Sequence, residues 1–152
     1  MNNTGIKTIP NELFFEHVMS LLEEGKAVKF ALRGESMRPF LKQNDLITVK
    51  PIREVSLKKG HIVLAQWNAK FVLHRIIRLE QKKIYLAGDG NLSQIEEVSE
   101  NDVIAFLSEV TRDGRSIDLY SKSALFYASV WLRLRFFRKV WHKLFGSKIY
   151  KR

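Results

Sequence analysis

Residues 34–41 read GESMRPFL and lie between two runs with β-strand character, residues 28–33 and 46–49. In the first run apolar residues alternate with mostly charged ones, as in a strand that is buried on one side. The glycine that opens residues 34–41 breaks this strand, and the proline within them keeps a regular helix from starting. We therefore expect Ser36 to be displayed on a sharp turn at the end of a strand.

The β pattern continues through the first 118 residues. Short apolar runs recur at a spacing of roughly 8–12 residues and are separated by turn signals such as Asp113-Gly114. A polar loop is expected at residues 93–102. The apolar runs lie at residues 61–67, 71–79, 84–87, 103–110 and 116–120. The sequence therefore predicts a mainly β fold, a coiled antiparallel sheet or partly open barrel.

A helix is expected at each end of the chain. Residues 10–24 carry apolar side chains at helical spacing, with a proline in the first turn and a glycine after the last. Residues 121–145 predict one amphipathic helix, rich in aromatic and basic side chains, that Gly146 would end. We divide the chain into a β domain at residues 1–118, which includes the first helix, and a C-terminal helix and tail at residues 119–152.

The net charge of +10 belongs to the C-terminal helix and tail. Residues 1–118 carry 17 Lys/Arg and 16 Asp/Glu, whereas residues 119–152 carry nine Lys/Arg and no acid. We expect the helix at 121–145 to bind a membrane surface, with its tryptophans at the headgroup boundary, or a protein partner, and both alternatives stay open. Nucleic acid is not expected, because the aromatic bulk exceeds what a phosphate-tracking helix needs.

Several function classes are excluded by what the sequence lacks. It has no cysteine, which rules out disulfides and thiolate chemistry. Its four histidines show no metal-ligand spacing, so we expect neither a metal nor a cofactor. Residues 1–7 are polar and predict no signal peptide, and no apolar run is long enough to span a membrane. The expected location is the cytoplasm or the cytoplasmic surface of the membrane.

His74 is the residue that would make a nucleophile of Ser36. Strand alternation puts it on the same face as Val72 and Ile76, an unusual place for an imidazole without a function. A serine hydroxyl needs a base within hydrogen-bond reach, and imidazole side chains ordinarily titrate near neutral pH. From spacing alone, the alternative that both are ordinary strand-end residues stays open.

Five motifs, in order across about residues 28–110, are similar to those of the type I signal peptidase superfamily. Its relatives include the self-cleaving domains of LexA-type repressors. GESMRPFL resembles the nucleophile motif, and VLHRII resembles the base motif in its histidine form. NDLITV, GHIVLAQW and GDGN resemble three further motifs. The resemblance implies the mainly β fold of this superfamily and a serine endopeptidase that cuts an extended leader or signal peptide.

The resemblance also implies roles for individual residues. Ser36 would be the acyl-forming nucleophile, with its own N–H as an oxyanion donor on the turn that Gly34 opens, and His74 would be the general base. Met37 and Pro39 would line the substrate groove, although Met37 suits the core equally well.

Other positions match the superfamily less closely. Asp89, in GDGN, would orient His74 or hold the site together, and an ordinary turn residue is the alternative. The acid that the superfamily carries further along has no clean match, with Glu96 or Glu97 close but offset. Asn44 and His61 replace a glycine and an aspartate of the motifs.

Two alternatives to a processing peptidase stay open. One is a non-catalytic peptide-binding module that kept the fold, for which the departures from the motifs are the support. The other is a self-cleaving regulator, which would need an internal scissile Ala-Gly or Cys-Gly bond. For the processing peptidase, the peptide is expected to lie along a sheet edge, and the resemblance implies small residues at the cleavage site.

Overall fold

A computed structural model describes residues 11–149 of the chain, without the side chains of residues 11, 12, 54, 136 and 145–149. The elements follow in the order α1 (Asn11–Glu23), β1 (Val28–Ala31), β2 (Leu46–Pro51), the 3-10 turn η1 (Ile52–Glu54), β3 (Ile62–Trp67), β4 (Lys70–Glu80), β5 (Lys83–Ala87), β6 (Glu96–Val98), the 3-10 turn η2 (Glu100–Asp102), β7 (Val103–Arg112), β8 (Arg115–Ser116), α2 (Lys122–Arg133) and α3 (Arg135–Ile149). The mainly β fold predicted from the sequence is confirmed.

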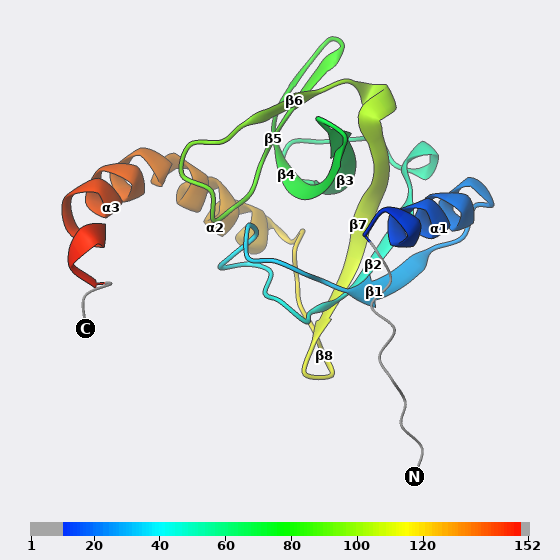
Figure 1. The fold of residues 1–152 in the computed structure, drawn as a ribbon, viewed down its shortest axis with the longest axis horizontal. Helices are drawn as coiled ribbons and strands as arrows, with labels where there is room; N and C mark the ends of the chain where they lie inside the picture. Colours follow the sequence, from blue (N-terminus) through cyan, green and yellow to red (C-terminus); the bar gives the residue numbers. More distant parts are fainter. Residues whose placement is uncertain (1–10, 150–152) are drawn as a thin grey trace.

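The strands form one curled antiparallel sheet in the order β1-β2-β7-β3-β4-β5-β6, with β8 paired to β7. The long strand β7 joins the two parts of this sheet, because it pairs with both β2 and β3. Figure 1 shows α1 on one side of the sheet and the pair α2 and α3 extending from the other.

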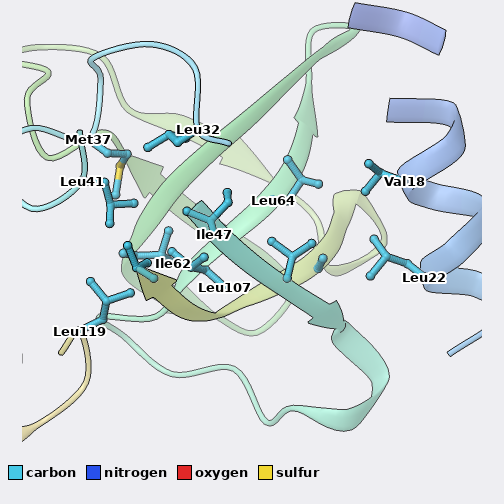
Figure 2. Close-up of a cluster of buried hydrophobic side chains, with 13 residues drawn as sticks. Val18, Leu22, Leu32, Met37, Leu41, Ile47, Ile62, Leu64, Leu107 and Leu119 are labelled. Carbon is cyan, nitrogen blue, oxygen red and sulfur yellow. The ribbon is translucent and has the colours of Figure 1, made fainter. Parts of the chain in front are cut away.

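A larger core lies on one face of β3. The side chains of Ile62 and Leu64 point into it, and α1 covers it with Val18 and Leu22 (Figure 2). Its 13 buried members are all apolar, as the alternating strand pattern leads one to expect. They are Val18, Leu22, Leu32, Met37, Leu41, Ile47, Val49, Ile62, Leu64, Ala105, Leu107, Val110 and Leu119.

A smaller core lies on the other face of β3, so that this strand is buried on both sides. Its members are Val63, Ala65, Ile76, Ile84, Leu86, Val98 and Val103. Alternation along β4 puts Val72, His74 and Ile76 on this face, and the register pairs Val63 with His74. The candidate base therefore lies in the row of residues that builds the smaller core.

Three predictions about secondary structure are wrong. The polar residues 93–102 contain β6, because pairing with the edge of β5 satisfies the backbone whatever the side chains. Of the strand expected at 116–120, only Ser116 belongs to a strand, because β8 is Arg115–Ser116. The helix expected at 121–145 divides at Leu134 into α2 and α3, and α3 continues past Gly146, since a helix tolerates an interior glycine at a cost of about 1 kcal/mol.

The first predicted helix agrees with α1 apart from its start at Pro10, which lies outside the described residues. Gly25 follows α1 at φ 81°, the left-handed conformation that ends many helices. No helix within residues 11–149 is long and apolar enough to cross a membrane.

Candidate active site

Ser36 lies on the loop between β1 and β2 and is exposed to solvent. Two backbone hydrogen bonds close this loop, from the Leu32 N–H to the Asp45 carbonyl at 2.8 Å and from the Asn44 N–H to the Leu32 carbonyl at 2.9 Å. The next side chain along the chain, Met37, is only 2% exposed and anchors the loop in the larger core. The loop is therefore anchored in the core and exposes Ser36 on its outer side.

The geometry brings Ser36 and His74 together. The Ser36 Oγ lies 3.0 Å from the His74 Nε2, within hydrogen-bond distance. His74 is 5% exposed, because it is a central residue of β4 between neighbouring strands. The hydroxyl is thus open to solvent while its partner is held in the protein interior.

Glu96, the first residue of β6, is the acid beside His74. Its Oε2 lies 3.0 Å from the His74 Nδ1, and its side chain is fully buried. An ionised carboxylate can only accept hydrogen bonds, so an ionised Glu96 would favour the tautomer of His74 that carries its proton on Nδ1. In that tautomer the Nε2 of His74 could accept a proton from the Ser36 hydroxyl.

Asp89 makes a different contact from the one predicted for an orienting acid. Its carboxylate accepts hydrogen bonds from the Arg75 Nε at 2.9 Å and from the Arg75 Nη2 at 2.9 Å, in a bidentate ion pair that is buried on both sides. Burial raises the pKa of the Asp89 carboxyl, and the Arg75 guanidinium opposes this rise. The acid that contacts the His74 ring is Glu96, whereas Asp89 ties the turn after β5 to β4.

Two glycines of the GDGN turn let it pack tightly against the loop of Ser36. The Gly90 N–H donates to the Ser36 carbonyl at 2.8 Å. A Cβ on Gly88 would lie 2.6 Å from the Ser36 carbonyl oxygen and 3.0 Å from the His74 Nε2. Only glycine fits at position 88, because a side chain there would push the nucleophile and the base apart.

The other predicted positions are distributed around this centre. Met37 lies in the larger core, the alternative that suited it equally well, while Pro39 is exposed on the same loop as Ser36; the groove role of both stays a prediction. Gly34 has φ 95° and open space around its Cβ position. Asn44, at φ 70°, adopts the left-handed conformation that the glycine of the motif would favour.

His61 packs among aromatic rings. Its ring packs against Phe106 and Tyr120, with centroids 4.9 and 5.6 Å away. Burial, helped by the charge of Lys58, lowers the pKa of the His61 imidazole. It therefore takes a packing position where the superfamily motif has an aspartate.

The amphipathic character predicted for the C-terminal helix appears as an exposed apolar face on α2 and α3. The exposed apolar side chains are Phe126, Tyr127, Leu134, Phe137, Val140, Trp141 and Leu144. Whether this face binds a membrane surface or a protein partner stays a prediction. Among residues 11–149 no cluster of three potential ligands could hold a metal ion.

The sequence indicated Glu96 only as one of two candidates, with Glu97, that are close to but offset from the position of the superfamily's acid. Two other residues near the site were missed. The ion pair of Arg75 with Asp89 was missed because the sequence around an arginine in an apolar strand does not indicate which acid it pairs with. Trp131 of α2 donates from Nε1 to the Asp89 carbonyl at 2.7 Å, a contact between elements far apart in the sequence.

Comparison with protein families supports this fold. A family model described as peptidase S24-like matches residues 6–111. No curated protein matches the chain. The match covers Ser36, His74 and Glu96 and ends before α2 begins.

Proposed function

The chain belongs to the peptidase S24-like family, within the LexA and signal peptidase-like superfamily, and from this premise we propose that it is a serine endopeptidase. In this proposal Ser36 is the nucleophile, His74 the general base, and Glu96 the acid that orients the base.

One observation carries the proposal, the continuous chain of contacts from Ser36 Oγ through His74 to Glu96. Both links measure 3.0 Å. A nucleophile bonded to a base that is itself oriented by a third group is the arrangement that activates a serine hydroxyl. Burial of His74 and Glu96 strengthens the pair electrostatically, because little water screens it.

The proposed reaction begins when the Ser36 Oγ attacks the carbonyl carbon of the scissile peptide bond and its proton moves to the His74 Nε2. Glu96 stabilises the imidazolium that forms. The C–N bond then breaks, and the leaving amine takes the proton from His74. Water, deprotonated in turn by His74, then attacks the acyl carbon. The ester C–O bond to Ser36 breaks, and His74 returns the proton to the Ser36 Oγ, which restores the enzyme.

The oxyanion of each tetrahedral intermediate needs hydrogen-bond donors. The Ser36 N–H makes no hydrogen bond within residues 11–149, which leaves it available for this task. Gly34 has no side chain that could supply a second donor. We therefore expect the oxyanion site to depend on backbone groups.

The proposed substrate is an extended peptide, such as a leader or a secretory precursor, with small residues at the cleavage site. β1 lies at one end of the strand order and leads into the loop that carries Ser36. A peptide that pairs with the side of β1 that has no partner strand within residues 11–149 would run towards the nucleophile.

A self-cleaving regulator is less well supported. The chain contains one Ala-Gly dipeptide, Ala87-Gly88, and no Cys-Gly. Ala87 is fully buried and pairs with Arg75 in the sheet, so this peptide bond belongs to the frame that holds His74.

The test is a proteome-wide comparison of protein N-termini in cells that express wild type, Ser36→Ala or the control Ser56→Ala. Ser56 is an exposed serine on the loop between η1 and β3. We expect a set of mature N-termini to vanish and longer precursors to accumulate with Ser36→Ala alone. Unchanged N-termini with a folded Ser36→Ala protein would instead favour a non-catalytic peptide-binding module, which would keep its affinity for peptide without Ser36.

A further inference from the structure

The loop of residues 88–95 determines where the acid of the site lies. It joins β5 to β6 and has no regular secondary structure, and Glu96 follows it directly as the first residue of β6. At its other end the Gly90 N–H binds the Ser36 carbonyl and Asp89 binds Arg75. A shift of this loop would therefore move the acid relative to the base.

Three side chains of the C-terminal helices donate hydrogen bonds to this loop. The Trp131 Nε1 donates to the Asp89 carbonyl at 2.7 Å, and the Arg138 Nη1 donates to the same carbonyl at 3.3 Å. The Arg135 Nη2 donates to the carbonyl of Gln94, two residues before Glu96. The helices thus hold the loop near both ends.

Two of these side chains also fix one another. The Arg138 guanidinium lies 3.9 Å from the centroid of the Trp131 ring and donates from Nη2 to the Trp131 carbonyl at 3.2 Å. The contact joins the two helices across their division at Leu134, because Trp131 belongs to the last turn of α2 and Arg138 to the first turn of α3.

The positive charges of Arg135 and Arg138 are complementary to the negative charges of nearby acids. Arg135 interacts electrostatically with Glu96, and Arg138 with Asp89. The Glu96 Oε1 is buried and makes no hydrogen bond within the described part of the chain. A neighbouring cation lowers the cost of keeping such a carboxylate ionised.

We propose that Trp131, Arg135 and Arg138 are positioning residues that hold the loop of residues 88–95 so that Glu96 stays bonded to His74. The C-terminal helices, which lie beyond the family match, then complete the active site. This inference rests on the proposed function, because the bond that it explains is the one that would orient the base.

The test compares full-length Trp131→Phe and Arg135→Gln with the control Arg133→Gln, which changes an exposed arginine at the end of α2. The activity probe is a synthetic peptide across the cleavage site of a precursor that accumulates with Ser36→Ala. We expect kcat to fall about tenfold in both variants, because a small displacement of Glu96 leaves His74 poorly oriented, while KM changes less than about twofold. Arg133→Gln should keep both values.

A second readout does not depend on turnover. The proton on the His74 Nδ1 that is shared with Glu96 should give a low-field proton NMR signal in wild type. This signal should shift or broaden in Trp131→Phe and Arg135→Gln, stay in Arg133→Gln, and return in part in Arg135→Lys. A merely structural role would lower the melting temperature without moving the signal in the folded protein.

The outcomes separate the two proposals. A wild-type kcat and an unmoved NMR signal in both variants would overturn the positioning role. If Arg135→Gln does not fold, Trp131→Phe decides alone, because it keeps an aromatic ring and removes the donor. If wild type cleaves no precursor, the proposed function fails, and the NMR signal still decides whether the helices position Glu96.

Discussion

The two cores on either face of β3 differ in what they contain. The larger core is wholly apolar, whereas the smaller core shares its face of β4 with His74 and lies beside Glu96. Each of these polar groups would cost about 1–3 kcal/mol if buried without a partner, so the 3.0 Å bond between them is what makes their burial tolerable. The larger core stabilises the fold, and the smaller core carries the candidate site.

The loop of residues 34–41 joins these two regions. Met37 and Leu41 are buried in the larger core, and Ser36 between Gly34 and Met37 reaches His74 at the edge of the smaller one. Substitutions beside the candidate site should therefore lower activity, whereas substitutions on the side of the larger core should lower stability.

The largest effect is expected for Glu96→Gln. The introduced side-chain amide could donate to the His74 Nδ1 and so select the tautomer whose Nε2 already carries a proton and cannot accept one from Ser36. Turnover of the precursor peptide should fall by about 10²–10⁴-fold with little change in melting temperature. Glu97→Gln is the control, because Glu97 is exposed and pairs with Lys83. An equal loss of turnover in both variants would contradict the role of Glu96 as the acid that orients His74.

A smaller loss of turnover is expected for Gly88→Ala. The added Cβ would lie 2.6 Å from the Ser36 carbonyl oxygen, so the loop of Ser36 must move away from His74. Turnover should fall by about 10²-fold. Gly114→Ala provides the contrast, since Gly114 has φ 75° in a remote hairpin and open space around it. It should lower stability and leave turnover per folded molecule intact; wild-type turnover in Gly88→Ala would show that the two loops need not touch.

The smallest effect is expected on the side of the larger core, for Asp45→Asn. Burial raises the pKa of Asp45, but hydrogen bonds from Arg112 and from the Lys42 N–H outweigh burial and leave the pKa below its usual value. A carboxyl with a lowered folded pKa stabilises the protein above its unfolded pKa of about 3.9 and loses this contribution as the pH falls through the folded value.

Denaturant unfolding at several pH values checks this expectation. Asp45→Asn should lower the free energy of unfolding by about 1–3 kcal/mol at pH 7, and the difference from wild type should shrink below about pH 4. Turnover per folded molecule should stay unchanged. Exposed Glu109→Gln serves as the control, and a pH-independent difference for Asp45→Asn would mean that the charge of Asp45 contributes nothing.

The sequence by itself determined the mainly β class, which is a local property, because side-chain alternation, glycine and proline act over a few residues. Its motifs also indicated Ser36 and His74 as a pair, but this came from the resemblance to a known superfamily, because the two residues are 38 positions apart. The positive φ values at Gly25 and Gly34 follow from the same local chemistry.

Only the tertiary structure decided which acid serves His74. Asp89 and Glu96 lie seven residues apart, and their roles follow from the register of β4, β5 and β6 rather than from any local signal. The contact of Trp131 with the Asp89 carbonyl likewise depends on how α2 packs against a distant loop. Local sequence specifies the elements, but the partners of a buried polar group depend on which elements the fold brings side by side.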